Sequence, residues 1–319
     1  MKYLSWVLVA LFSAIFVYDY IPAPNIYAEG VVNFWMYKPY VYRVLIPLLA
    51  RGVMLLGVPH NWALAGVVFT SGLASFGALK LFYSSYIAKN RLWAFSLMSW
   101  LLMFTLMQNH KKHYDFATIF FFCLSLYLMV KIAAFNAMPV RMPIISNRHA
   151  ALLFALFPIM VLNRETTALL ILVYAIYFWG TDFKVYLIHI TYMTTTFLLV
   201  YFVIIQNVFR DWAGDSIHVL RHLTMETYLQ TPAMIFAVFI IIGCAMIIFT
   251  HWNDGTYSRF IKSALILVPI QIALHLLFGY PFEFRVLIES FPVFFVSVII
   301  GLTSTNRVFP KHTYRSIDI

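Results

Sequence analysis

Long apolar runs separated by short polar segments form most of the chain. Ten such runs predict helices, at about 3–18, 62–84, 92–108, 116–135, 150–162, 166–180, 186–206, 232–250, 261–279 and 287–303. The runs lack the period-2 alternation of membrane barrel strands and exceed their length of about ten residues. Because lipid offers no partner for backbone N–H and C=O groups, segments that cross a bilayer this way are helical. The pattern predicts an all-α, polytopic transmembrane helix bundle of about ten spans, with a range of 8 to 11.

Residues 41–57 differ from the other apolar runs. They carry Arg43, Pro47 and Arg51 among apolar positions. This mixture predicts an amphipathic helix lying in the membrane interface. No internal repeat or long linker interrupts the chain, so we expect one transmembrane domain over 1–319, without a separate soluble domain.

A polar triplet interrupts the apolar sequence near its middle. Asn163, Arg164 and Glu165 separate the fifth and sixth runs. Residues 150–180 therefore predict two short spans, a re-entrant pair or one long kinked helix. The triplet surfaces at a membrane boundary or is buried in the bilayer for a chemical reason.

The composition places the protein in a membrane. Hydrophobic residues make up 63% of the 319 positions and charged residues 11%, against about 25% charged in a soluble domain. The first run lacks an A-x-A cleavage site, and we expect it to remain as the first span. The two cysteines, Cys123 and Cys244, lie inside apolar runs and are expected to pack as small apolar residues.

The distribution of charge predicts the orientation of the chain. With the N-terminus in the cytoplasm and alternating spans, 13 of the 22 basic residues and three of the 12 acidic residues lie inside. An excess of Lys and Arg on the cytoplasmic side is the rule for such proteins. We therefore expect a cytoplasmic (inner) membrane protein with both termini in the cytoplasm. The net charge of +10 then reflects cytoplasmic loops, and no soluble domain is present to bind nucleic acid.

The same alternation places most of the unusual polar residues on the outer side. They share an apolar or aromatic surrounding and come from six segments: Asp19, Glu29, Lys38, Arg43, His110, Lys111, Lys112, His113, Asp115, Arg164, Glu165, His218, Arg221, His222, Glu283 and Arg285. Several have a simple structural interpretation. Asn163 can cap the sixth span, with Glu165 in its first turn, and Asp115 can cap the fourth. Glu283 and Arg285 can form an interfacial ion pair.

The segment HKKH, residues 110–113, places two lysines and two histidines in one short outer loop, against the charge rule. Phospholipid headgroups explain them, and so does a phosphate or diphosphate on a lipid carrier, for which Lys acts as a point charge. Arg43, Arg164 and Arg285 could clamp phosphate with two hydrogen bonds each. Asp19 and Glu29 could act as a general base, or hold a divalent cation such as Mg²⁺ or Mn²⁺. No pair of residues has diagnostic metal-ligand spacing, so a metal stays unassigned.

Four of these segments resemble one known superfamily. YRVLIPLLAR, HYDFATIFFF, NRETTALL and FRVLIESFPVF, in this order over about 17–295, resemble bacterial members of the GT-C superfamily of membrane glycosyltransferases. The resemblance implies an acidic catalytic residue in the first extracytoplasmic loop and a polyprenyl-phosphate sugar donor. It implies Asp19 as the first choice for that acid and Glu29 as the second. Lys111, Lys112, Arg164 and Arg285 would then contact the donor phosphate.

Three functions follow from these observations. The first is transfer of a hexosyl or pentosyl group from a lipid-phosphate donor to a surface glycan or glycolipid, as in polysaccharide biosynthesis. The second is a lipid-linked-sugar flippase or transporter, which predicts ionisable residues at mid-span depth. The third is a non-catalytic lipid-binding membrane subunit. An enzyme needs the outer clusters to meet at one site, whereas a scaffold would scatter them. The sequence leaves the sugar, the acceptor and the oligomeric state open.

Overall fold

The computed structural model describes residues 1–22, 25–34, 43–107, 112–136, 147–208, 232–253, 255–278 and 287–304. Over these residues the secondary structure is helical, without strands, which confirms the all-α prediction for this part of the chain. The chain divides into two compact units, Met1–Ile217 and His218–Ile319. A single transmembrane domain over 1–319 stays a prediction.

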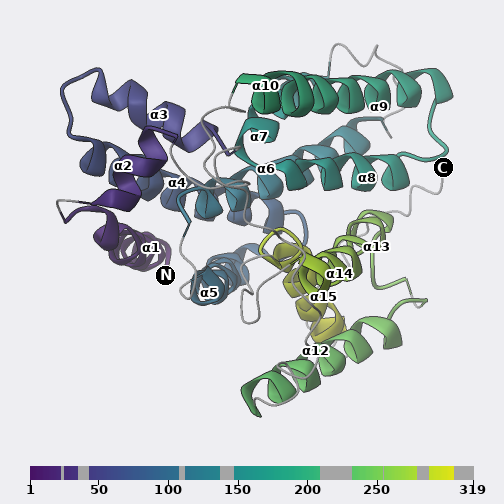
Figure 1. The fold of residues 1–319 in the computed structure, drawn as a ribbon. Helices are drawn as coiled ribbons and strands as arrows, with labels where there is room; N and C mark the ends of the chain where they lie inside the picture. Colours follow the sequence, from purple (N-terminus) through teal and green to yellow (C-terminus); the bar gives the residue numbers. More distant parts are fainter. Residues whose placement is uncertain are drawn as a thin grey trace. The chain divides into compact units, whose positions relative to one another are not determined.

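The first half of unit Met1–Ile217 has the following helices. They are α1 (Lys2–Val17) with the 3₁₀ turn η1 (Tyr18–Tyr20), α2 (Ile26–Val32), α3 (Leu45–Met54), α4 (His60–Tyr83), α5 (Lys89–Met107) and α6 (Asp115–Asn136). Helix α4 packs against α1, α3, α5 and α6 and so lies at the centre of this part (Figure 1).

The second half of this unit continues from α6. Its elements are α7 (Arg148–Asn163), the 3₁₀ turn η5 (Glu165–Thr167), α8 (Ala168–Tyr177), α9 (Phe183–Leu198), the π-helix η6 (Leu199–Ile205) and α10 (Gln206–Val208). Helix α7 packs against α6 and α9, and α8 packs against α9. Unit His218–Ile319 contains α12 (Pro232–Thr250), α13 (Arg259–Ala264), α14 (Leu267–Phe278) and α15 (Phe291–Ser304), in which α15 packs against α12 and α13.

Small residues allow close packing around α4. A Cβ atom on Gly72 would lie 2.4 Å from Ser13 Oγ, so α1 and α4 approach closely because position 72 is glycine. On the neighbouring side, the Trp100 ring stacks on Phe116 with centroids 5.5 Å apart. Its indole N–H donates to Ser75 Oγ over 2.9 Å, which satisfies a polar group that burial would otherwise leave costly.

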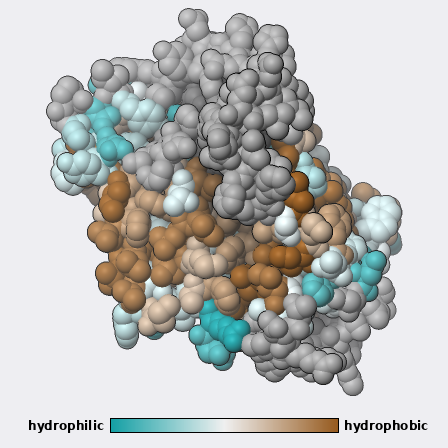
Figure 2. Space-filling model, turned by 90° about the horizontal axis from the view of Figure 1, so that it is seen from below, coloured by the Kyte–Doolittle hydropathy of each residue, from teal (hydrophilic) through white to brown (hydrophobic). Residues whose placement is uncertain are grey.

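Four helical segments of the described residues are long and apolar enough to cross a membrane. They are Lys2–Tyr20, His60–Tyr83, Asp115–Ala134 and Phe183–Ile205. All ten expected runs are helical over most of their length, but the remaining helices are shorter or less apolar, and about ten spans is not confirmed. Apolar residues cover a broad area of the face in Figure 2, and hydrophilic residues gather towards its margins. These features are compatible with a membrane protein.

The structure excludes one of the three interpretations of residues 150–180. Helix α7 contains Pro158 and ends at Asn163, and Arg164 is extended, with φ −163° and ψ 140°. The helix is therefore broken rather than bent, and one continuous kinked helix is wrong. The Met160 carbonyl near the end of α7 accepts from the Arg164 N–H over 3.1 Å and from the Thr167 hydroxyl over 3.0 Å, which connects the turn to the helix.

The predicted interfacial helix is α3, Leu45–Met54, shorter than the expected 41–57. It buries Leu45, Ile46 and Ala50 and exposes Leu48 and Leu49, so it is apolar on its packed and on its open face. The location of α3 in the membrane interface stays a prediction.

Candidate functional site

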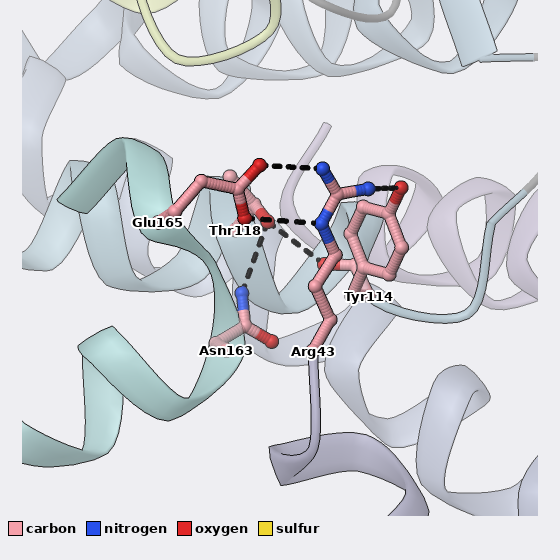
Figure 3. Close-up of polar contacts among 5 residues, drawn as sticks. All are labelled: Arg43, Tyr114, Thr118, Asn163 and Glu165. Carbon is pink, nitrogen blue, oxygen red and sulfur yellow. Dashed lines mark hydrogen bonds and ion pairs between the residues drawn. The ribbon is translucent and has the colours of Figure 1, made fainter. Parts of the chain in front are cut away.

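Three segments that are far apart in the sequence meet around the Arg43 side chain (Figure 3). Arg43 precedes α3, Tyr114 precedes α6, and Glu165 begins the turn after α7. Arg43 Nη2 donates to Glu165 Oε1 over 2.6 Å and Nε donates to Oε2 over 3.2 Å. Its Nη1 donates to the Tyr114 hydroxyl. We call Arg43, Tyr114, Thr118, Asn163, Arg164 and Glu165 the arginine cluster.

Backbone geometry at the helix ends positions these side chains. Asn163 is the last residue of α7, and its Nδ2 donates to Thr118 Oγ1 on α6 over 3.0 Å. The Thr118 hydroxyl donates in turn to the Tyr114 carbonyl over 3.0 Å. The expectation that Asn163 caps the next helix is wrong, because the residue before α8 is Thr167 and no side chain caps it there.

The two partners of the Arg43–Glu165 pair differ in their exposure to solvent. The Arg43 side chain is 7% exposed and the Glu165 side chain 30%. Burial by itself would raise the pKa of Glu165, but the Arg43 charge and its hydrogen bonds, with a smaller contribution from Arg164, lower that pKa from 4.5 to about 2. Glu165 lies outside the four candidate spans and is ionised at neutral pH.

A second arginine faces the same tyrosine. The Arg164 guanidinium carbon lies 5.6 Å from the Tyr114 ring centroid, and that of Arg43 lies 4.3 Å away. A tyrosine face attracts cations at such distances. Arg164 is buried, at 4% exposed. The ring of Tyr114 thereby holds two of the predicted phosphate-binding arginines in one place.

Aromatic contacts connect the first loop to this cluster. The Tyr20 and Tyr27 rings stack with centroids 5.7 Å apart, and the Tyr27 hydroxyl is hydrogen-bonded to His113 Nδ1 over 3.2 Å. The His113 ring then meets Tyr114 edge to face at 5.0 Å. The contacts form a continuous path from Tyr20, the neighbour of Asp19, to Arg43.

The first loop is itself anchored. Asn25 Nδ2 donates to the Asp19 carbonyl over 2.7 Å, and Asn61 Nδ2 donates to the Ile21 carbonyl over 2.5 Å. The Arg51 side chain donates to the Val32 carbonyl over 2.6 Å. These bonds fix the backbone on both sides of α2, which carries Glu29.

The predicted site residues are thus partly assembled. Arg43, His113 and Arg164 contact Tyr114, and Glu165 pairs with Arg43. The Lys112 amine lies 5.8 Å from the Tyr27 ring centroid. The Asp19 and Glu29 side chains are exposed, on η1 and α2. Asp115 is fully buried and accepts from the Lys112 N–H over 3.2 Å. Eight predicted residues lie outside the described ones: Lys38, His110, Lys111, His218, Arg221, His222, Glu283 and Arg285.

A metal site is not visible in this part of the chain. Among the described residues, no group of three or more His, Cys, Asp or Glu side chains could hold an ion. The two cysteines are free thiols, Cys123 buried and Cys244 half-buried.

Several polar residues of the structure were not expected from the sequence. Tyr114 and Thr118 organise the arginine cluster, yet each looks like an ordinary residue beside a charged motif. His189 lies within the candidate span Phe183–Ile205 and is hydrogen-bonded to the Tyr174 hydroxyl over 2.5 Å. In unit His218–Ile319, the unexpected residue is Gln271, whose Nε2 donates to the fully buried Glu289 over 2.6 Å. In the sequence, His189 and Gln271 are marked only as single polar residues within apolar runs.

Comparison with known proteins gives no assignment. The chain matches no protein-family model, no curated protein sequence and no solved structure.

Proposed function

We propose that this protein is a membrane glycosyltransferase of the GT-C type that uses a polyprenyl-phosphate-linked sugar at the extracytoplasmic face of the inner membrane. The observation that carries the proposal is the arginine cluster, in which loops expected on the outer side contact one another. A scaffold with scattered polar residues does not require these contacts. The membrane bundle supplies the setting in which a lipid-linked donor is found.

The residues divide into two chemical roles. The Asp19 carboxylate is the proposed general base, with Glu29 as the second choice, and takes the proton from an acceptor hydroxyl. The acceptor oxygen forms a bond to the anomeric carbon as the bond from that carbon to the donor phosphate oxygen breaks. Arg43 and Arg164 stabilise the charge that develops on the leaving phosphate. Lys112 and His113, at the edge of the cluster, add positive charge or hydrogen bonds.

The location of Asp19 supports this division. Asp19 is exposed on η1, the last turn of the candidate span Lys2–Tyr20, so an acceptor from outside can reach it. The path through Tyr20, Tyr27 and His113 leads from that turn to the arginines. This path joins the turn that carries the proposed base to the proposed anion site.

The test is consumption of a labelled polyprenyl-phosphate sugar by purified full-length protein. Following the donor allows an unknown acceptor, or water, to complete the reaction. We expect Asp19→Asn to reduce consumption by about 10²–10⁴-fold, the usual contribution of a general base. Arg164→Ala is expected to raise the apparent KM for donor, because it removes a phosphate contact. Mg²⁺, Mn²⁺ and EDTA arms test whether a divalent cation takes part.

Asp182→Asn is the matched control for Asp19. Asp182 caps α9 through Lys184 and Val185 N–H groups, and asparagine can make the same bonds. The control removes an equal charge and should consume donor like wild type. If no lipid-phosphate sugar is bound or consumed, the proposal fails; if Glu29→Gln alone is inactive, the base is reassigned to Glu29.

A further inference from the structure

The Arg43 guanidinium has the geometry of an anion-binding site, and the Glu165 carboxylate of the same chain occupies that site. Two guanidinium N–H groups point at the two oxygens of one carboxylate, at 2.6 and 3.2 Å. Arginine binds phosphate oxygens through the same paired arrangement. A phosphate oxyanion and the Glu165 carboxylate therefore compete for the same face of Arg43.

The exposure of the two partners indicates which one can leave. Arg43 is 7% exposed and is also held by Tyr114, whereas Glu165 is 30% exposed. Figure 3 shows Glu165 and Tyr114 on different sides of the guanidinium. An incoming anion can thus replace the carboxylate while Arg43 keeps its tyrosine contact.

The backbone at Glu165 belongs to a short element. Glu165 begins a three-residue 3₁₀ turn directly after the extended residue Arg164, between two helices. A side chain on such a turn can swing away by rotating a few backbone and side-chain torsions, without unpacking a helix. Its departure would leave Arg43 and Arg164 on the same Tyr114 ring.

From these observations we propose that Glu165 is a displaceable internal ligand that occupies Arg43 until the phosphate of the lipid-linked donor takes its place. This inference rests on the proposed function for the identity of the anion, and it adds a regulatory role for Glu165. The site is closed to weak anions and opens to a phosphate that contacts both arginines. Glu165 consequently lowers the apparent affinity for phosphate. It restricts the site to ligands that bind the two arginines strongly enough to displace the carboxylate.

Binding measurements on the full-length protein in detergent test this role. Inorganic pyrophosphate, a short polyprenyl monophosphate and phosphatidylglycerol serve as separate probes, titrated against wild type and Glu165→Gln. If Arg43 is released from Glu165 in about one molecule in ten, removing the competitor tightens the apparent Kd about tenfold. Tightening for pyrophosphate as well as polyprenyl phosphate indicates recognition of the phosphate itself. A tighter Kd for polyprenyl phosphate alone indicates that the site recognises a lipid-borne phosphate. A tighter Kd for phosphatidylglycerol alone overturns the role of Glu165 in donor binding.

Two further variants make the result decisive. Glu165→Ala, which removes the side chain entirely, should tighten binding as Glu165→Gln does, and Arg43→Gln should abolish the gain in the double variant Arg43→Gln/Glu165→Gln. Asp182→Asn, with an equal change of charge, should bind like wild type. Unchanged or weaker binding in both Glu165 variants overturns the proposal, because Glu165 then only orients Arg43. Donor consumption is measured separately, so tighter phosphate binding without any consumption defeats the glycosyltransferase and leaves the exchange intact.

Discussion

The arginine cluster and the Tyr174–His189 pair both bury polar side chains among apolar helices of unit Met1–Ile217. In the cluster, charged Arg43 contacts Glu165 and Tyr114, which come from two other segments. In the pair, Tyr174 on α8 and His189 on α9 share a hydrogen bond of 2.5 Å, and the Phe154 ring lies 4.4 Å from the histidine.

The difference between them follows from charge. A buried charge is costly unless an opposite charge and further hydrogen bonds surround it, so the cluster needs several segments. A neutral histidine and a phenol satisfy each other with one bond and can sit within a span. We interpret the connected charges at the loop ends as the proposed site for a charged ligand, and the neutral pair within the helices as a helix–helix contact.

The largest expected effect comes from Arg43→Gln. The change removes the guanidinium and leaves the Glu165 carboxylate without its ion-pair partner Arg43. Breaking a fully buried pair costs about 3–5 kcal/mol, and the 30% exposure of Glu165 reduces our expectation to roughly 2–3 kcal/mol. Denaturant unfolding in detergent measures the loss.

Arg148→Gln is the control for that measurement. Arg148 is exposed at the start of α7, and its replacement should change the free energy of unfolding by about 0.5 kcal/mol or less. The double variant Arg43→Gln/Glu165→Gln should lose less unfolding free energy than the two single variants lose together, because it leaves no unpaired charge. Strict additivity would show that the pair does not stabilise the fold.

The sequence predicted much of the helical framework. The apolar runs mark the helices to within a few residues, since a lipid-facing helix needs an apolar surface and helix ends need polar residues or breaks. Helix length was less predictable. The expected helix over 261–279 is divided between two helices, because α13 ends at Ala264 and α14 begins at Leu267. Pro269 accounts for this break, because it has no N–H to donate to the Leu265 carbonyl and its ring clashes with that carbonyl in a continuous helix.

The candidate site was predictable in its charges but not in its connections. Arg43, Arg164 and Glu165 are conspicuous because charges are rare in this chain. That Arg43 pairs with Glu165, 122 residues away, depends on how α3, α6 and α7 pack. Tyr114 carries no charge and repeats a common residue type, so nothing in the sequence distinguishes it from the other tyrosines.

Asn163→Ala should have the next largest effect. The Asn163 amide donates to Thr118 within the cluster and is 2% exposed. Loss of a buried hydrogen bond with its partner left behind costs about 1–3 kcal/mol. Asn90→Ala, at an exposed position of α5, should be close to neutral in the same unfolding assay. Equal effects at both positions would contradict a connected cluster.

Tyr174→Phe tests the neutral pair and should cost about 1 kcal/mol, because His189 Nδ1 loses its partner in an apolar surrounding. The double variant Tyr174→Phe/His189→Leu should recover part of this loss, since neither polar group is then buried. Donor consumption should stay within about twofold of wild type in both, as expected for a contact that only joins helices. A larger change in consumption would give the pair a functional role and remove its contrast with the cluster.

The smallest expected effect is that of pH near neutrality on the cluster. The pKa of Glu165 is about 2 in the folded protein, below the ordinary 4.5, so its charge stabilises the fold fully above pH 4.5. That stabilisation is lost as the pH falls from 4.5 towards 2, where the folded carboxylate takes up a proton. The difference in unfolding free energy between wild type and Glu165→Gln should therefore be constant from pH 5 to 8 and shrink below pH 4.5. A difference that already changes between pH 6 and 7 would mean that a histidine, and not the carboxylate, controls the stability of the cluster, with His113 as the first residue to replace.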